Sequence, residues 1–128
     1  MNDLLMKYDL EYLGKGGHSI VYKAVNKITK EEYALKLVKK RDEEKDSMVI
    51  KEILLHSKLN HPNIIKLINS FEDDENFYIF LELCGEDLYN YIKNNNKKIK
   101  EDEVVNIIKQ ISLSVKYLHD NNITHRDI

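Results

Sequence analysis

A glycine-rich stretch near the N-terminus combines residue types that suit phosphate binding. Residues 13–21 read LGKGGHSIV. Glycine has no Cβ, so backbone N–H groups in such a stretch can approach phosphate oxygens closely. Ser19 stands where a GxGxxG pattern has its third glycine, and the following residues continue as a strand, where a dinucleotide-binding fold needs a helix. Taken alone, the stretch indicates either a phosphate site or a flexible hairpin.

A lysine at the centre of an apolar segment is the second group with chemical potential. Residues 33–38 read YALKLV, and the small Ala34 lies two residues before Lys36, on the same face of a strand. Burying an unpaired ammonium group is costly, so Lys36 needs an acidic partner unless it points to solvent. Glu52, within the helical pattern VIKEILLH, is the candidate partner. It would hold the ammonium group against phosphate oxygens, although most helix glutamates are only solvated.

Two hydrophobic periods divide the chain and predict the elements that position these residues. Up to about residue 83, short β-branched or aromatic runs alternate with turn signals, which predicts antiparallel strands. One helical pattern interrupts them, from about Asp46 to Leu59, and Pro62 disfavours helix beyond it. After Cys84 the pattern is helical. The predicted strands are Tyr8–Lys15, Ser19–Asn26, Glu32–Val38, Leu67–Glu72 and Asn76–Leu83, and the later helices are Asp87–Lys93 and Glu101–Asp120.

Composition bounds the class of protein and its partners. The chain has 128 residues, enough for one ordinary domain, with 42% hydrophobic and 33% charged residues. A net charge of −2 gives no reason to expect nucleic acid or an anionic membrane as partner. We expect neither a transmembrane helix nor a signal peptide. The single cysteine, Cys84, favours a reducing, cytoplasmic or nuclear location.

Five motifs together resemble the N-terminal lobe of a eukaryotic-type protein kinase. They occur in the family's order and spacing and span Tyr8 to Ile128. The resemblance implies an α+β fold, in which a five-stranded antiparallel sheet with one helix precedes the first helices of a truncated helical lobe. It places the ATP-binding lobe at 8–83, and the hinge and start of the second lobe at 84–128. The motifs are GKGGHSIV, YALK, KEILLHSKLNHPNI, YIFLELCG and HRD.

A polo-like branch of this family is indicated by two further features. His56 follows Glu52 by four residues, and SFEDDENFYIFLELC has an acidic turn before an aromatic strand. The branch is the reason to prefer serine and threonine over tyrosine as the residues that are phosphorylated. The sequence GGH at positions 16–18 departs from every branch pattern, which leaves the branch open.

The resemblance implies that ATP is the cofactor and that specific residues contact it. Lys36, paired with Glu52, would contact the α- and β-phosphates. Val21 and Ala34 would form the roof of the adenine pocket, with Leu81 in the gatekeeper position. Backbone groups of the hinge would hydrogen-bond the adenine edge, and Asp87 is the candidate ribose contact. The glycine-loop residues near the phosphates are Leu13, Gly14, Lys15, Gly16, Gly17, His18 and Ser19, and the hinge residues are Glu82 and Cys84.

The last motif carries the catalytic prediction. In isolation, His125-Arg126-Asp127 is most simply a polar turn, but the resemblance makes Asp127 the base that accepts the proton of a protein substrate's hydroxyl group. The family's Mg²⁺ ligands would lie beyond Ile128, so the 128-residue chain is expected to be inactive or nearly so. A non-catalytic nucleotide-binding or regulatory fragment is the alternative function, and a nucleotide-free interaction module is a third.

The last predicted helix needs a covering partner. Its apolar residues form one stripe along the helix, and the resemblance implies that the rest of the helical lobe covers this stripe. The 128-residue chain lacks that lobe, so either the lobe or another protein would be needed to cover the stripe, because an exposed apolar face of this size promotes association. The stripe consists of Val104, Ile107, Ile108, Ile111, Val115 and Leu118.

Overall fold

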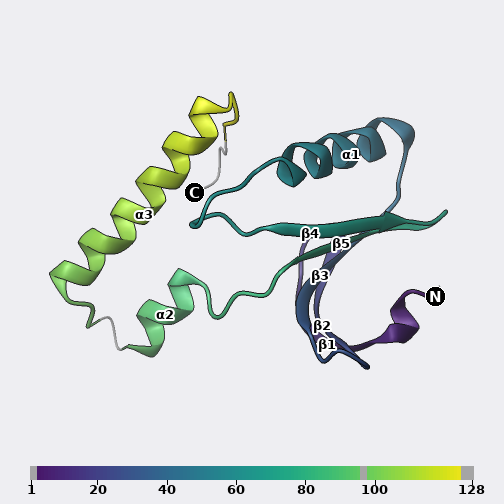
Figure 1. The fold of residues 1–128 in the computed structure, drawn as a ribbon, viewed down its shortest axis with the longest axis horizontal. Helices are drawn as coiled ribbons and strands as arrows, with labels where there is room; N and C mark the ends of the chain where they lie inside the picture. The colour runs from purple at the N-terminus through teal and green to yellow at the C-terminus, as the bar shows by residue number, and fades with distance from the viewer. Residues whose placement is uncertain (1–2, 96–97, 125–128) are drawn as a thin grey trace. The chain divides into compact units, whose positions relative to one another are not determined.

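A computed structural model describes residues 3–95 and 98–124 (Figure 1). Its strands form one antiparallel sheet in the order β1-β2-β3-β5-β4, so β1 and β4 are the edge strands. The α+β fold predicted from the sequence is therefore confirmed. The elements in chain order are η1 (Leu5–Lys7), β1 (Tyr8–Lys15), β2 (Ser19–Asn26), β3 (Glu32–Lys39), α1 (Glu43–Ser57), β4 (Leu67–Glu72), β5 (Asn76–Glu82), α2 (Leu88–Asn94) and α3 (Glu101–Asp120).

The two faces of the sheet carry different apolar clusters. On one face, Leu5 of η1 is buried together with Leu35 and Phe80, and several tyrosines pack around them. On the opposite face, Val38, Phe77 and Ile79 are buried beneath α1. Because successive residues of a strand point to opposite faces, β3 and β5 contribute to both clusters. Figure 1 shows α1 running along the sheet and η1 beside β1 and β2.

Helix α1 begins three residues earlier than its apolar pattern predicted, at Glu43 instead of Asp46. The reason is Asp42, whose side chain accepts a hydrogen bond of 2.8 Å from the Lys45 N–H and caps the helix. The acidic first turn that follows is favoured by the helix dipole but contributes no apolar periodicity. The helix ends at Ser57, two residues before the predicted end.

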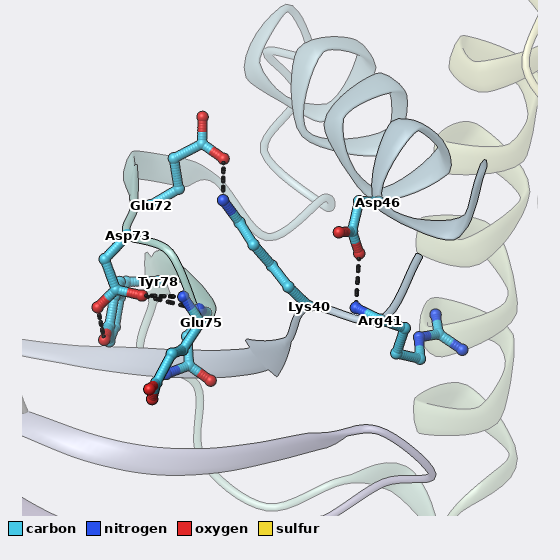
Figure 2. Close-up of polar contacts among 8 residues, drawn as sticks. Lys40, Arg41, Asp46, Glu72, Asp73, Glu75 and Tyr78 are labelled. Carbon is cyan, nitrogen blue, oxygen red and sulfur yellow. Dashed lines mark hydrogen bonds and ion pairs between the residues drawn. The ribbon is translucent and has the colours of Figure 1, made fainter. Parts of the chain in front are cut away.

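The turn between β4 and β5 is organised by Asp73 (Figure 2). Its Oδ1 accepts hydrogen bonds from the N–H groups of Glu75 (2.9 Å) and Asn76 (2.8 Å). The hydroxyl group of Tyr78, a buried residue of β5, donates a 2.5 Å hydrogen bond to the other carboxylate oxygen. An aspartate that mimics a backbone turn in this way explains why the acidic sequence EDDEN forms a tight connection.

The chain forms two compact units. One comprises residues 1–59 and 65–84, and the other comprises residues 60–64 and 85–128. Within the second unit, the segment 60–64 contacts α3, because the Asn60 N–H donates to the Tyr117 hydroxyl group at 2.9 Å and the Asn63 side chain donates to Gln110 at 3.1 Å. The limits predicted from the sequence, 8–83 and 84–128, are not tested by this division and stay a prediction.

The described helices contain no stretch long and apolar enough to cross a membrane. Helix α3 contains no buried residue, and part of its apolar stripe is exposed, with Ile108 at 57% and Val104 at 39%. An apolar face with this exposure is the feature that the sequence predicted to need a cover.

Candidate functional site

The strand register brings the predicted nucleotide-binding residues of the sheet onto one face. Lys36 of β3 lies directly opposite Val21 of β2 on one side and Ile79 of β5 on the other. Ala34, two residues before Lys36, lies opposite Leu81. Directly opposed residues of antiparallel strands point to the same face. Val21, Ala34, Lys36 and Leu81 therefore share a face, as a common binding site requires.

This shared face is also the face that α1 covers. Ile79, the partner of Lys36, belongs to the buried cluster against which Val49 and Ile53 of α1 pack, and Leu81 lies against the same cluster. Lys36 itself is half-buried. An ammonium group at the margin of an apolar cluster needs water or an anionic partner, which fits a place beside phosphate oxygens.

The glycine-rich stretch forms the hairpin between β1 and β2. The Gly16 N–H donates a 2.8 Å hydrogen bond to the Ser19 carbonyl and closes the loop. A Cβ placed on Gly14 or Gly17 would meet no atom within 4 Å, and no glycine of the described chain has a positive φ. The fold alone therefore does not require glycine at 14 or 17. Open space at these positions suits a ligand that must approach the backbone closely.

Gly16 is different, because its Cβ position is crowded by another residue of the chain. A Cβ on Gly16 would lie 2.8 Å from Ser19 Oγ, closer than side chains pack. Ser19 points to the same face as Lys36, since its strand partner Val38 lies two residues beyond Lys36. The serine that replaces the third glycine of the pattern thus fills the space next to Gly16.

A β-bulge lies immediately before the loop. The register between β1 and β2 shifts between Tyr12 and Gly14, so that Leu13 has no directly opposed partner. Bulges of this kind bend a strand and redirect its side chains, and they are frequent next to active sites. Leu13 is half exposed. On the other side of the loop, the His18 carbonyl accepts a 3.3 Å hydrogen bond from the Lys39 N–H, which ties the loop to the end of β3.

Lys36 and Glu52 lie in the same unit but do not form an ion pair in the structure. Glu52 is exposed on α1. Within the described residues, 3–95 and 98–124, the ion pairs are Lys23–Glu32, Lys40–Glu72, Lys45–Asp42 and Lys116–Asp120. The pairing of Lys36 with Glu52 stays a prediction.

The predicted hinge follows directly from the end of β5. The Glu82 N–H donates to the Lys66 carbonyl at 2.9 Å, and the Glu82 carboxylate accepts from the Lys66 N–H at 3.1 Å. Cys84 lies just beyond and is exposed. Partial desolvation, with a smaller contribution from the Glu82 carboxylate, raises the pKa of the Cys84 thiol, so that it is less reactive than an ordinary cysteine at neutral pH.

Asp87 has a local role that sequence reasoning did not assign. It is the N-cap of α2, and its Oδ1 accepts a 2.7 Å hydrogen bond from the Asn90 N–H. Aspartate is among the preferred residues at this position, so the capping role alone accounts for its presence. The contact between Asp87 and a ribose stays a prediction.

The predicted catalytic base, Asp127, lies outside the described residues, together with His125 and Arg126. Among the residues that the structure does describe, no group of three or more histidine, cysteine, aspartate or glutamate side chains is arranged to hold a metal ion.

Two contacts near the two ends of α1 were not predicted. Before the helix begins, Lys40 Nζ lies 2.8 Å from the Glu72 carboxylate (Figure 2). The same nitrogen lies 5.0 Å from the centre of the Phe77 ring. The hydrogen bond with Glu72 raises the pKa of Lys40. At the end of the helix, His56 Nε2 lies 2.7 Å from the Ile65 carbonyl oxygen. Neither contact has a local sequence signal, because each depends on how distant segments meet.

Comparisons with known proteins show the family of the chain. Residues 8–128 match the protein kinase domain family. Serine/threonine-protein kinase polo of Drosophila melanogaster is 40% identical over 122 residues, covering 93% of this chain and 21% of that protein. Calcium-dependent protein kinase 5 of Plasmodium berghei is 39% identical over 130 residues, covering 99% of this chain and 23% of that protein.

A solved structure of a similar protein shows the same fold. The crystal structure of Rad53 1-466 in complex with AMP-PNP superposes with a TM-score of 0.83 at 30% identity, covering 98% of this chain and 33% of that one. The chain belongs to the protein kinase family, as the sequence predicted. Polo kinases are among its relatives, and calcium-dependent kinases match at nearly the same identity. The chain spans less than a quarter of the length of the two relatives described.

Proposed function

We propose that this chain binds ATP and forms the nucleotide-binding part of a serine/threonine protein kinase. The observation that carries the proposal is the shared face of Val21, Ala34, Lys36 and Leu81, next to a hairpin whose Gly14 and Gly17 have open space above them. An apolar surface suits an adenine ring, and a lysine with glycine N–H groups suits phosphates. The similar Rad53 structure is a complex with AMP-PNP, an ATP analogue, which supports the choice of ligand.

Each residue has a distinct task in this proposal. Val21, Ala34 and Leu81 enclose the adenine, and the hinge backbone at Glu82 and Cys84 provides its hydrogen-bond partners. No hydrogen bond within the described chain engages the backbone of Cys84, so its N–H is available for a ligand. The glycine hairpin, from Leu13 to Ser19, lies over the phosphates, and Asp87 contacts the ribose.

Lys36 is the residue on which phosphate positioning depends. Its ammonium group binds the α- and β-phosphates, and Glu52 holds it there once α1 brings the two side chains together. Asp127 accepts the proton of the substrate hydroxyl group. When bound, Mg²⁺ would neutralise phosphate charge in this reaction. The resemblance places the family's Mg²⁺ ligands beyond Ile128, so the 128-residue polypeptide is proposed to bind ATP without transferring phosphate. Phosphorylation of a generic protein substrate by this purified polypeptide would contradict that statement.

The proposed substrate is a protein serine or threonine, because the similar polo protein of Drosophila melanogaster is named as a serine/threonine-protein kinase. We further propose an intracellular location, where ATP is plentiful and the single thiol of Cys84 stays reduced. The apolar stripe of α3 would be covered by the remainder of a helical lobe or by another protein.

Protection of Lys36 from acylation tests the nucleotide site directly. The 128-residue chain is treated with a lysine-acetylating reagent with and without ATP, and labelling is measured at each lysine by mass spectrometry. ATP is expected to reduce labelling of Lys36 and to leave the exposed Lys39 of the same strand unchanged. Equal labelling of Lys36 with and without ATP would rule out the proposed site.

A further inference from the structure

His56 is the only residue of the described chain whose side chain bonds the last turns of α1 to the segment leading into β4. The two atoms, His56 Nε2 and the Ile65 carbonyl oxygen, are 2.7 Å apart although the residues are nine positions apart in the chain. Ile65 lies two residues before β4. A carbonyl oxygen can only accept, so the imidazole must carry a proton on Nε2 and donate it.

The position of His56 on the helix connects this bond to Glu52. Residues three, four and seven apart lie on one face of a helix. Val49 and Ile53, which pack on the buried cluster of the sheet, precede His56 by seven and three residues. Glu52 precedes His56 by four residues and follows Val49 by three, so it lies beside this inward face. A rotation of α1 about its axis would move Glu52 and His56 together.

We propose that His56 is a positioning residue for the nucleotide site: its Nε2–H bond to the Ile65 carbonyl fixes the rotation of α1 and thereby the place of Glu52 relative to Lys36. The apolar contacts of Val49 and Ile53 do not set this rotation closely, because they are non-directional. A short hydrogen bond with a required donor geometry does set it. The expected effect on ATP binding rests on the proposed nucleotide function. The bond between His56 and Ile65 does not depend on that function.

The bond is tested on the unmodified chain by its spectroscopic signature. In the 128-residue chain, ¹⁵N and ¹³C NMR of the histidine side chains distinguishes a proton on Nε2 from one on Nδ1. Neutral His56 is expected to carry its proton on Nε2, with slow exchange of that proton. A neutral His56 with its proton on Nδ1 would overturn the proposal, whatever the chain does with ATP.

The positioning effect is tested by two substitutions that differ in one property. His56→Gln keeps an amide donor at about the reach of Nε2, whereas His56→Leu has no donor but a comparable apolar bulk. We expect His56→Leu to raise the ATP concentration that half-protects Lys36 from acetylation by roughly two- to tenfold, the factor that one hydrogen bond is worth. His56→Gln is expected to restore most of the wild-type value.

Two comparisons separate positioning from loss of folding and from failure of the nucleotide site. His119→Leu removes an exposed histidine from the last turn of α3 and is expected to leave the half-protecting concentration unchanged. Equal losses in His56→Gln and His56→Leu, or no loss in either, would overturn the proposal. If ATP does not protect Lys36 even in the wild-type chain, the proposed function fails, and slow exchange of the His56 Nε2 proton still decides whether His56 holds the end of α1.

Discussion

Two glycines of the hairpin between β1 and β2 have different surroundings, and this difference has consequences that can be measured. Gly14 faces open space, whereas Gly16 lies against the Ser19 hydroxyl group. A methyl group at position 14 would therefore meet only a ligand, and a methyl group at position 16 would meet the protein itself. The sequence pattern alone treats both glycines alike, since a GxG motif does not report what lies above each Cα.

We expect Gly14→Ala to weaken ATP protection of Lys36 while leaving thermal stability nearly unchanged.

Gly16→Ala is expected to destabilise the chain by about 1 kcal/mol, because the new Cβ crowds Ser19 Oγ and the short serine side chain can only partly move away. Ser19→Ala removes that oxygen, so the double variant is expected to regain most of the loss. Denaturant unfolding of the wild type, Gly16→Ala, Ser19→Ala and the double variant measures the coupling between the two positions. If the two single losses of stability simply add in the double variant, the contact between Gly16 and Ser19 is contradicted.

Tyr78 gives a prediction on pH dependence. Burial, and then its bond to Asp73, raise the pKa of the Tyr78 hydroxyl group above 10.0. The folded state therefore keeps this proton when the unfolded state has lost it, so the contribution of Tyr78 to stability is complete below pH 10 and falls as the pH rises above it. Tyr78→Phe is expected to cost about 1 kcal/mol at pH 7 and to lose less stability than the wild type above pH 10.

The matched control for Tyr78 is the exposed Tyr12 of β1. Tyr12→Phe is expected to leave both the stability at pH 7 and its decline above pH 10 unchanged, since this side chain is 61% exposed. Urea unfolding at a series of pH values measures both variants. Parallel pH profiles for wild type and Tyr78→Phe would show that the bond to Asp73 does not contribute.

At the scale of the elements, strands were predicted more closely than the helix that orients the site. Strand β3 runs one residue further than predicted, to Lys39, and β5 ends one residue earlier, at Glu82. Alternation and turn residues are local signals, so they suffice for strands. The start of α1 was missed because Asp42 determines it by capping, and the apolar pattern begins only one turn later.

The contacts that fix the site in space were not predictable from local pattern. The strand order places β5 between β3 and β4, and this order brings Glu72 to Lys40. His56 reaches Ile65 only because the segment after α1 returns to the sheet. Motif spacing predicted Lys36 and Ala34 as site residues. Their common face with Val21 and Leu81 follows from the strand register, which the sequence alone does not specify.

The cap of α1 gives the prediction at this scale. Asp42→Ala is expected to lower the melting temperature by a few degrees, because the first helical N–H groups lose their acceptor, while Asp42→Asn retains most of the stability. The hydrogen bond from the Lys45 N–H lowers the pKa of Asp42 below 3.8. Its contribution is therefore present above pH 3.8 and is lost as the pH falls through the lowered value.

Calorimetry of wild type and both variants at pH 7 and pH 3 tests this cap. The difference between the wild type and Asp42→Ala is expected to shrink at pH 3. A difference that is as large at pH 3 as at pH 7 would mean that a charged Asp42 is not what holds the start of α1.

At the scale of the whole molecule, buried residues are distributed unevenly between the two units. The sheet contains two buried clusters, whereas neither α2 nor α3 contains a buried residue. Burial of apolar surface is the main source of stability, so the sheet unit is expected to be the more stable of the two. A kinase chain of this extent would then present an ordered nucleotide-binding sheet followed by helices whose stability depends on further contacts.

Hydrogen exchange measures this difference. Backbone amides of β5, where residues 77–80 are buried, are expected to exchange only through global unfolding, while amides in the middle of α3 exchange through local opening at a lower free energy. Adding denaturant is expected to accelerate β5 exchange steeply and α3 exchange weakly, because little apolar surface is exposed when α3 opens. If the two sets of amides showed the same free energy and the same denaturant dependence, the helices would unfold with the sheet as one cooperative unit, and the apolar stripe of α3 would have to be protected by contacts within the chain itself.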